Sequence, residues 1–185
     1  MAQAKLWTRH SIIRVLMMGL LATFLASCRA DDKPIGMTLL FQSAGRPVGV
    51  RRFDPDGVRG PVPGSVGGMF PRGGAQMSFM PGDSKRGMPQ FVDVAWVVST
   101  PEYEQWIKNR DSLPNSVRYS PQGIAESKLE GDKQPQYTKR IDLTPIITPE
   151  LIAQVRANVQ TTQLKLIITF NNDDVNIEAL AYKWR

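Results

Sequence analysis

The side chains that most often carry catalysis are nearly absent from this sequence. It has one cysteine, Cys28, and one histidine, His10, both close to the N-terminus. The chain downstream of them therefore has no Ser-His-Asp or Cys-His arrangement, no histidine or cysteine metal site and no disulfide. Carboxylate or Ser-Lys chemistry would remain for an enzyme, and neither has a recognisable motif here. We expect a protein that is not an enzyme and that needs no metal and no cofactor.

Cys28 directly follows an apolar run, residues 15–27. No acid precedes this run, and three basic residues do: Lys5, Arg9 and Arg14. A basic start, a short apolar stretch and small residues at the end are typical of a secretory signal peptide. The run is shorter than the roughly 20 residues of a membrane-spanning helix. Its last four residues resemble the bacterial lipobox: Leu25, Ala26, Ser27 and Cys28. The resemblance implies that Cys28 receives a diacylglycerol, that the chain is cut before it, and that the new amine is acylated. An ordinary secretory signal with a chance cysteine is the alternative.

The lipobox divides the chain into a signal peptide (1–27), the lipidated cysteine with a short tether (28–34) and one globular domain (35–185). In the lipoproteins of enteric bacteria, an aspartate directly after the acylated cysteine is the usual retention signal for the inner membrane. This chain has Arg29 there, so we expect a lipid anchor in the outer membrane, with the domain facing the periplasm. Without residues 1–27 the formal charge falls from +6 to +3. Arg51-Arg52 and Lys139-Arg140 are isolated pairs, so nucleic-acid binding is not expected.

Alternating apolar residues predict several strands in the domain. The clearest is 91–98, whose even positions are all apolar and whose odd face is only modestly polar, which favours a central strand covered on both sides. On it, Asp93 is expected to pair with a neighbouring Arg or Lys. Residues 37–41 and 48–53 predict a hairpin, and 54–57 a type I turn. Further strands are expected at 75–80, 137–143, 164–170 and 175–184, the last with a bulge near Ala179, where the apolar phase slips by one residue.

Two helices are expected from one capping device, Thr100-Pro101-Glu102 and Thr148-Pro149-Glu150: a threonine N-cap, a proline at the first helical position and an acid in the first turn. The apolar stripes of both helices should serve the core. Residues 111–136, between them, are polar and interrupted by prolines, and predict a long connection. These elements together predict an α+β fold, mainly antiparallel β (a β-sandwich or curled sheet), with two short helices.

Residues 45–90 contain 11 of the 15 glycines and 7 of the 14 prolines. Within them, 57–74 lacks helix or strand patterning, and it has neither the Gly-Lys-Ser/Thr ending nor the following helix of a phosphate-binding loop. Long loops in small domains are often functional. This loop carries residue types that are enriched at protein interfaces, so it is the predicted partner-binding element: Arg59, Met69, Phe70 and Arg72. The alternative is an irregular loop or a glycine-assisted sheet edge.

The order of these features resembles small bacterial lipoproteins encoded beside phospholipase effectors of type VI secretion systems, where they act as immunity proteins. The matching pieces are the lipobox, the strand and turn at 50–57, the glycine pairs at 67–68 and 73–74, and the strand at 92–96. The resemblance implies a membrane-anchored protein that binds and neutralises a lipase-type effector in the envelope. A structural or assembly lipoprotein of the envelope or of a secretion machine is the alternative, and an envelope hydrolase that uses Asp/Glu chemistry is a third.

Overall fold

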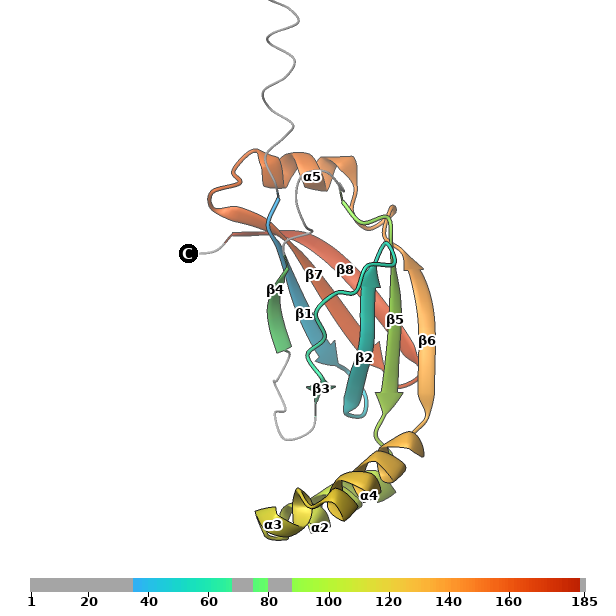
Figure 1. Ribbon diagram of the computed structural model, residues 1–185. Helices are drawn as coiled ribbons and strands as arrows, with labels where there is room; N and C mark the ends of the chain where they lie inside the picture. Colours follow the sequence, from blue (N-terminus) through green and yellow to red (C-terminus); the bar gives the residue numbers. More distant parts are fainter. Residues whose placement is uncertain (1–34, 68–74, 80–87, 184–185) are drawn as a thin grey trace, which may run out of the picture. The chain divides into compact units, whose positions relative to one another are not determined.

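The protein folds into two four-stranded sheets with short helices at the ends of strands (Figure 1). The computed structural model describes residues 35–67, 75–79 and 88–183. One sheet has the order β4-β1-β7-β8 and the other β3-β2-β5-β6. The elements are β1 (Met37–Ser43), β2 (Val48–Pro55), β3 (Ser65–Val66), β4 (Ala75–Phe79), β5 (Phe91–Val98), α2 (Pro101–Asp111), α3 (Asn115–Arg118), α4 (Pro121–Asp132), β6 (Gln136–Asp142), α5 (Pro149–Arg156), β7 (Thr162–Asn171) and β8 (Asp174–Lys183).

Among the described strands, β1 and β7 pair in parallel and the other pairs are antiparallel. The α+β class, mainly β, is therefore confirmed. The described part of the chain has four short helices where two were expected. None of the described helices is long and apolar enough to cross a membrane.

The inner faces of the two sheets share one apolar core. Every second residue of β1, β5 and β7 points into it and is buried, as the alternation in the two later strands predicted: Met37, Leu39, Phe41, Val92, Val94, Trp96, Val98, Leu164, Leu166, Ile168 and Phe170. Aromatic rings meet across the core: Phe41 contacts Phe53 edge to face at 5.2 Å between ring centroids, and Trp96 contacts Phe170 at 5.6 Å. The Trp96 indole also stacks on Tyr137 of the neighbouring β6.

β1 and β2 lie in different sheets, so the predicted hairpin between them is wrong. β1 pairs with β4 and β7, whereas β2 pairs with β3 and β5. Two long-range hydrogen bonds hold the connection between β1 and β2. The Ala44 N–H donates to the Phe170 carbonyl (2.8 Å), and the Arg46 N–H donates to Asn172 Oδ1 (3.2 Å). These bonds fasten the connection to the end of β7, where the chain passes from one sheet to the other.

β5 lies between β2 and β6, as expected of a central strand, but its outer face is only partly covered. Its even residues are buried, whereas on the outer face Val97 is buried and Phe91, Asp93 and Ala95 are half-buried. The expected pairing of Asp93 is confirmed: both carboxylate oxygens accept from Arg140, at 2.7 and 2.8 Å. This hydrogen bonding lowers the pKa of Asp93 below its ordinary value. The Arg140 guanidinium also lies over the Phe91 ring, 4.3 Å from its centroid.

The predicted bulge near Ala179 is wrong. β7 and β8 pair without interruption from Thr162 opposite Lys183 to Asn171 opposite Asp174. The inward row of β8 simply continues with small residues, since Ala179 and Ala181 pack against the core. Larger apolar side chains then occupy outward positions, which produces the slip in the sequence pattern. The register shift lies in β2 instead, between Val50 and Arg52.

The turn at 54–57 is not type I, because Asp56 has a positive φ of 48°. An aspartate tolerates this conformation better than most residues. Its carboxylate accepts hydrogen bonds from the Gln90 N–H (2.9 Å) and the Phe91 N–H (3.2 Å). The turn is therefore bound to the start of β5.

Both Thr-Pro-Glu helix starts are confirmed. The Thr100 hydroxyl accepts from the Tyr103 N–H and the Thr148 hydroxyl from the Leu151 N–H, each at 3.3 Å. α5 buries Val155 in the core, as expected, whereas α2 has no buried residue, so the expectation that its apolar stripe serves the core is wrong.

The prediction of a long connection at 111–136 is also wrong, because this segment contains α3 and α4. α4 begins with the same device, in which Ser120 caps a proline-led first turn.

The first prediction concerns the core. Trp96→Ala removes a side chain that is 1% exposed and packs against Phe170 and Tyr137, so it should lower the free energy of unfolding by about 3–5 kcal/mol. Chemical denaturation measures this loss. Trp106→Ala is the matched control: Trp106 lies on α2, which has no buried residue, and its loss should be less than half as large. Equal losses in the two variants would contradict this account of the core.

Candidate functional site

Only one of the predicted site residues lies in the part of the chain that the structure describes. The lipobox and three of the four predicted binding residues lie outside the described residues: Leu25, Ala26, Ser27, Cys28, Met69, Phe70 and Arg72. Arg59 is described, and its side chain is exposed. It leads to the first of two candidate surfaces.

The described part of the glycine-rich loop, residues 57–67, runs along the free edge of β2. The Gly60 N–H donates to the Phe53 carbonyl (3.0 Å), the Val50 N–H donates to the Gly64 carbonyl (2.6 Å), and β3 then pairs with the start of β2. For these residues the alternative of a glycine-assisted sheet edge is therefore correct. Between the two hydrogen bonds, Pro61 and Pro63 have no N–H to donate, and a cleft remains beside the strand.

The bulge in β2 turns two consecutive arginines toward this cleft. Val50 and Phe53 are buried in the core, and both residues between them, Arg51 and Arg52, are exposed and line the cleft. In a regular strand these two side chains would point to opposite faces. The extra residue of the bulge lets them lie on the same side.

The arginine cleft, as we call it, has a volume of about 310 Å³ and is lined by Arg51, Arg52, Asp54, Gly57, Arg59, Gly60 and Val62. It holds three guanidinium groups and one carboxylate. The closest ion pair is loose, with Arg52 Nε 3.8 Å from Asp54 Oδ2. Among the described residues, Arg51 and Arg59 have no hydrogen-bond or ion-pair partner for their side chains. The cleft therefore has an excess of positive charge that the described protein does not neutralise.

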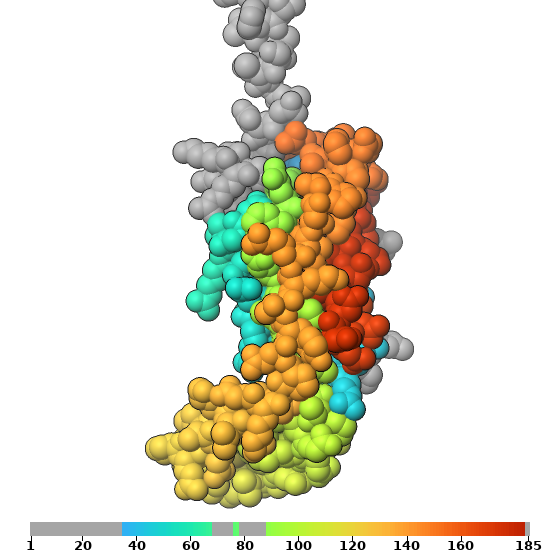
Figure 2. All heavy atoms as spheres, turned by 90° about the vertical axis from the view of Figure 1, so that its right-hand side faces the viewer, coloured from blue at the N-terminus to red at the C-terminus, as the bar shows by residue number. Residues whose placement is uncertain are grey.

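The second candidate surface is the helical projection, residues 101–132, which contains α2, α3 and α4 and connects β5 to β6 (Figure 1). Its base is held by Gln134, which is 6% exposed. The Gln134 side chain accepts from the Thr100 N–H (2.9 Å) and donates to the Glu130 carbonyl (2.9 Å). α5 packs against β7 and β8, whereas no helix of the projection makes more than marginal contact with a strand. Figure 2 shows the atoms of the projection, in yellow-green and yellow, beyond the N-terminal end of β6.

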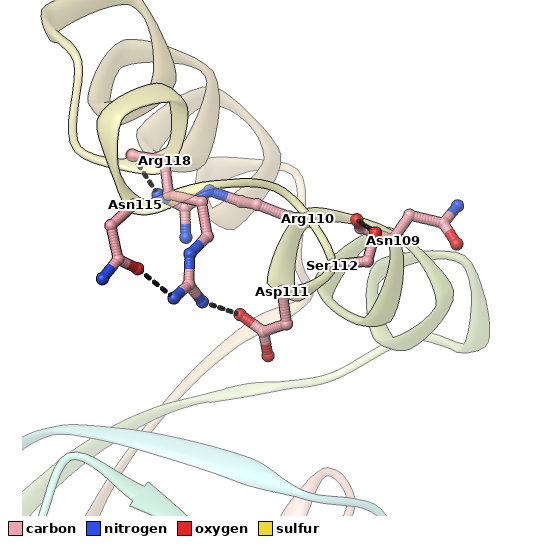
Figure 3. A network of polar contacts seen from close by, with 6 residues as sticks. All are labelled: Asn109, Arg110, Asp111, Ser112, Asn115 and Arg118. Carbon is pink, nitrogen blue, oxygen red and sulfur yellow. Dashed lines mark hydrogen bonds and ion pairs between the residues drawn. The ribbon is translucent and has the colours of Figure 1, made fainter.

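Polar contacts hold the helices of the projection together (Figure 3). Arg118 donates to Asp111 (2.9 Å) and to Asn115 (2.5 Å), and its own carbonyl accepts from Arg110 (2.7 Å). The Arg110 guanidinium also lies over the Trp106 ring, at 5.6 Å from its centroid. These arginines are therefore engaged within the projection, unlike Arg51 and Arg59.

The projection exposes an unusual amount of apolar side chain. Seven large hydrophobic residues of the described chain are exposed, and five of them, each 45–65% exposed, belong to it: Leu113, Val117, Tyr119, Ile124 and Leu129. Two of these, Leu113 and Val117, line a groove of about 200 Å³ together with Trp106 and Gly123, bordered by Arg110, Arg118 and Glu126. We call it the apolar groove. Sequence analysis missed it because it assigned 111–136 to a connection.

The described residues offer no cluster of metal-binding side chains. No three His, Cys, Asp or Glu side chains among them lie close enough to hold a metal ion. The carboxyl groups of Glu102 and Glu150 have lowered pKa values because they accept backbone hydrogen bonds in the first turns of their helices. Lys139 likewise lowers the pKa of Asp174 by donating to it at 2.6 Å, between β6 and β8.

No protein-family model matches the sequence, and searches of curated proteins and of solved structures find no match. The two surfaces are therefore the basis for any functional argument.

The second prediction concerns the edge that forms the arginine cleft. A Cβ at Gly60 would lie well inside van der Waals distance of the Phe53 carbonyl oxygen, the same atom that Gly60 binds. Gly60→Ala should therefore lower the free energy of unfolding by about 2 kcal/mol. Gly36→Ala is the control, since a Cβ there meets Gln163 at an ordinary 3.5 Å. Chemical denaturation of both variants tests this, and equal stability would mean that the edge does not depend on Gly60.

Proposed function

We propose that this protein is a membrane-anchored, periplasm-facing lipoprotein that binds and neutralises an envelope-targeted toxic effector, a lipase-type protein. The observation that carries the binding role is the apolar groove, together with the other exposed hydrophobic residues of the helical projection. Apolar side chains that a small domain leaves exposed together usually mark an interaction surface. The lipobox supports the location, and the scarcity of catalytic side chains agrees with a protein that acts by binding.

The groove favours a protein partner over a small apolar ligand. A pocket of about 200 Å³ is smaller than the roughly 300–1,000 Å³ of typical ligand sites, but it can admit one apolar side chain of a partner as an anchor. Its border is charged and carries both signs, from Arg110, Arg118 and Glu126. We therefore expect a partner that offers an apolar side chain beside charged groups that complement these three.

Lipid attachment gives such a binder an advantage. Confinement of the protein to a membrane surface raises its concentration near a toxin that attacks that membrane. An assembly lipoprotein of the envelope would use the same anchor and the same groove, so the partner's toxicity distinguishes the two functions.

The third prediction tests the anchor. Cys28→Ala removes the sulfur that the lipobox would acylate. We expect the variant to lose metabolic labelling with a palmitate analogue. Equal labelling of Cys28→Ala and the unaltered protein would contradict the lipoprotein assignment.

The fourth prediction tests the groove. A photo-crosslinking residue in place of Leu113 should capture a protein from the native envelope, which mass spectrometry identifies and purification then makes available. Leu113→Ser with Val117→Ser should weaken direct binding of that purified partner by tenfold or more, because both side chains line the groove. Leu180→Ser is the control: Leu180 is another exposed hydrophobic, on β8, 37% exposed.

Thermal unfolding of these variants separates loss of binding from loss of folding. If Leu180→Ser weakens binding as much as the double variant, the groove is not the interface. The partner's effect in the periplasm then decides the function: toxicity that this protein relieves supports immunity, and a harmless partner supports the assembly alternative.

A further inference from the structure

The arginine cleft is a second site, independent of the apolar groove and of the proposed function. It concentrates Arg51, Arg52 and Arg59 on one side of a strand edge, with Asp54 as the only acid in its lining. Asp54 faces Arg52 across 3.8 Å, and the side chains are 18% and 47% exposed. This pair is too long for a hydrogen bond, so all three guanidinium groups keep donors for a ligand.

The same sheet face shows how an arginine is neutralised when the fold provides an acid. On the next two strands of the sheet, β5 and β6, Asp93 and Arg140 form a bidentate pair at 2.7 and 2.8 Å. No such partner is provided for Arg51 or Arg59 among the described residues. The bulge in β2 adds to the imbalance, since it turns two adjacent arginines to one side.

We propose that the arginine cleft binds a phosphate group. Its lining carries a formal charge of +2, from three arginines and one aspartate, and a phosphomonoester carries about −1.5 to −2 at neutral pH with three acceptor oxygens. A single carboxylate has only one charge and two oxygens, so it would satisfy one guanidinium fork and leave the others unpaired. The planar guanidinium matches two phosphate oxygens at once, which is why arginine is favoured for phosphate recognition.

The dimensions of the cleft suit a phosphate that is part of a larger molecule. A volume of about 310 Å³ lies at the lower end of the roughly 300–1,000 Å³ of ligand sites. Two glycines and Val62 form the rest of the lining, so there is room beside the arginines for a small organic group. A soluble phosphate ester and a phospholipid headgroup share this chemistry, and the experiment separates them.

Isothermal titration calorimetry of the full-length chain with glycerol 3-phosphate and with water-soluble dihexanoyl phosphatidic acid tests the site. The two probes carry the same phosphate, and only the second has acyl chains. We expect saturable binding that weakens as salt is added, and a loss of tenfold or more in both Arg51→Ala and Arg59→Ala, because each removes charged hydrogen bonds to the phosphate. Equal affinity for the probes supports a site for soluble esters, and tighter binding of the lipid supports a headgroup site.

Arg46→Ala is the matched control. Arg46 is an exposed arginine outside the cleft lining, so its removal changes the net charge equally and should leave phosphate binding within about twofold, as expected of a distant exposed charge. The proposal would be overturned if neither probe binds saturably. It would also be overturned if Arg46→Ala weakens phosphate binding as much as Arg51→Ala and Arg59→Ala do. Either result would leave the apolar groove and the proposed function untouched.

Discussion

The fold depends on one side chain, Trp96, and on the turn that it contacts. Its ring packs against Phe170 of the opposite sheet, and its indole N–H donates to the Asn172 carbonyl at 2.8 Å. Asn172 has the positive φ (55°) that a tight turn needs, and its side-chain oxygen accepts from the Arg46 N–H of the connection between the sheets. One tryptophan therefore links the central strand of one sheet, the β7–β8 turn and the crossover from β1 to β2. Burying that indole together with its hydrogen bond removes the cost of an unpaired donor in the core.

Because the sheets bury each other, the fold does not need most of its helices for its core. α5 contributes Val155, but α2 contributes no buried residue and α4 only two glycines. The projection is stabilised instead by its caps, by the Arg110–Arg118–Asp111 contacts and by the clamp of Gln134 at its base. Local interactions of this kind do not require apolar residues on the outside. The side chains of Leu113 and Val117, which are 45% and 48% exposed, take no part in these polar contacts, and this exposure supports a role in recognition.

The sequence was informative where the deciding interactions are local. Alternation predicted β5 and β7, and the Thr-Pro-Glu pattern predicted the starts of two helices. The hairpin of β1 and β2 failed because bonds to Phe170 and Asn172, far along the chain, decide where that segment goes. α3 and α4 were missed because prolines and glycines lower helix propensity, although Ser120-Pro121 repeats the capping device. Arg59 was identified by residue type, while Arg51 and Arg52 were dismissed as an isolated pair, because a bulge that turns both to one side leaves no trace in composition.

The glycine-rich segment 57–67 has a structural role beside the bulge in β2. An edge strand leaves unpaired backbone groups that invite aggregation, and residues 57–67 cover the edge of β2 by hydrogen bonds at Gly60 and Gly64. Glycine permits the close approach at the first position, and the positive φ of 78° requires it at the second. Pro61 and Pro63, between them, cannot donate hydrogen bonds to the strand. The segment is therefore not bonded to β2 at the bulge, where Arg51 and Arg52 lie. The glycines and prolines that cover this edge thus also leave a charged cleft open beside it. Protection of the edge alone would not need three arginines around that opening, and an anion bound between them would offset their mutual repulsion.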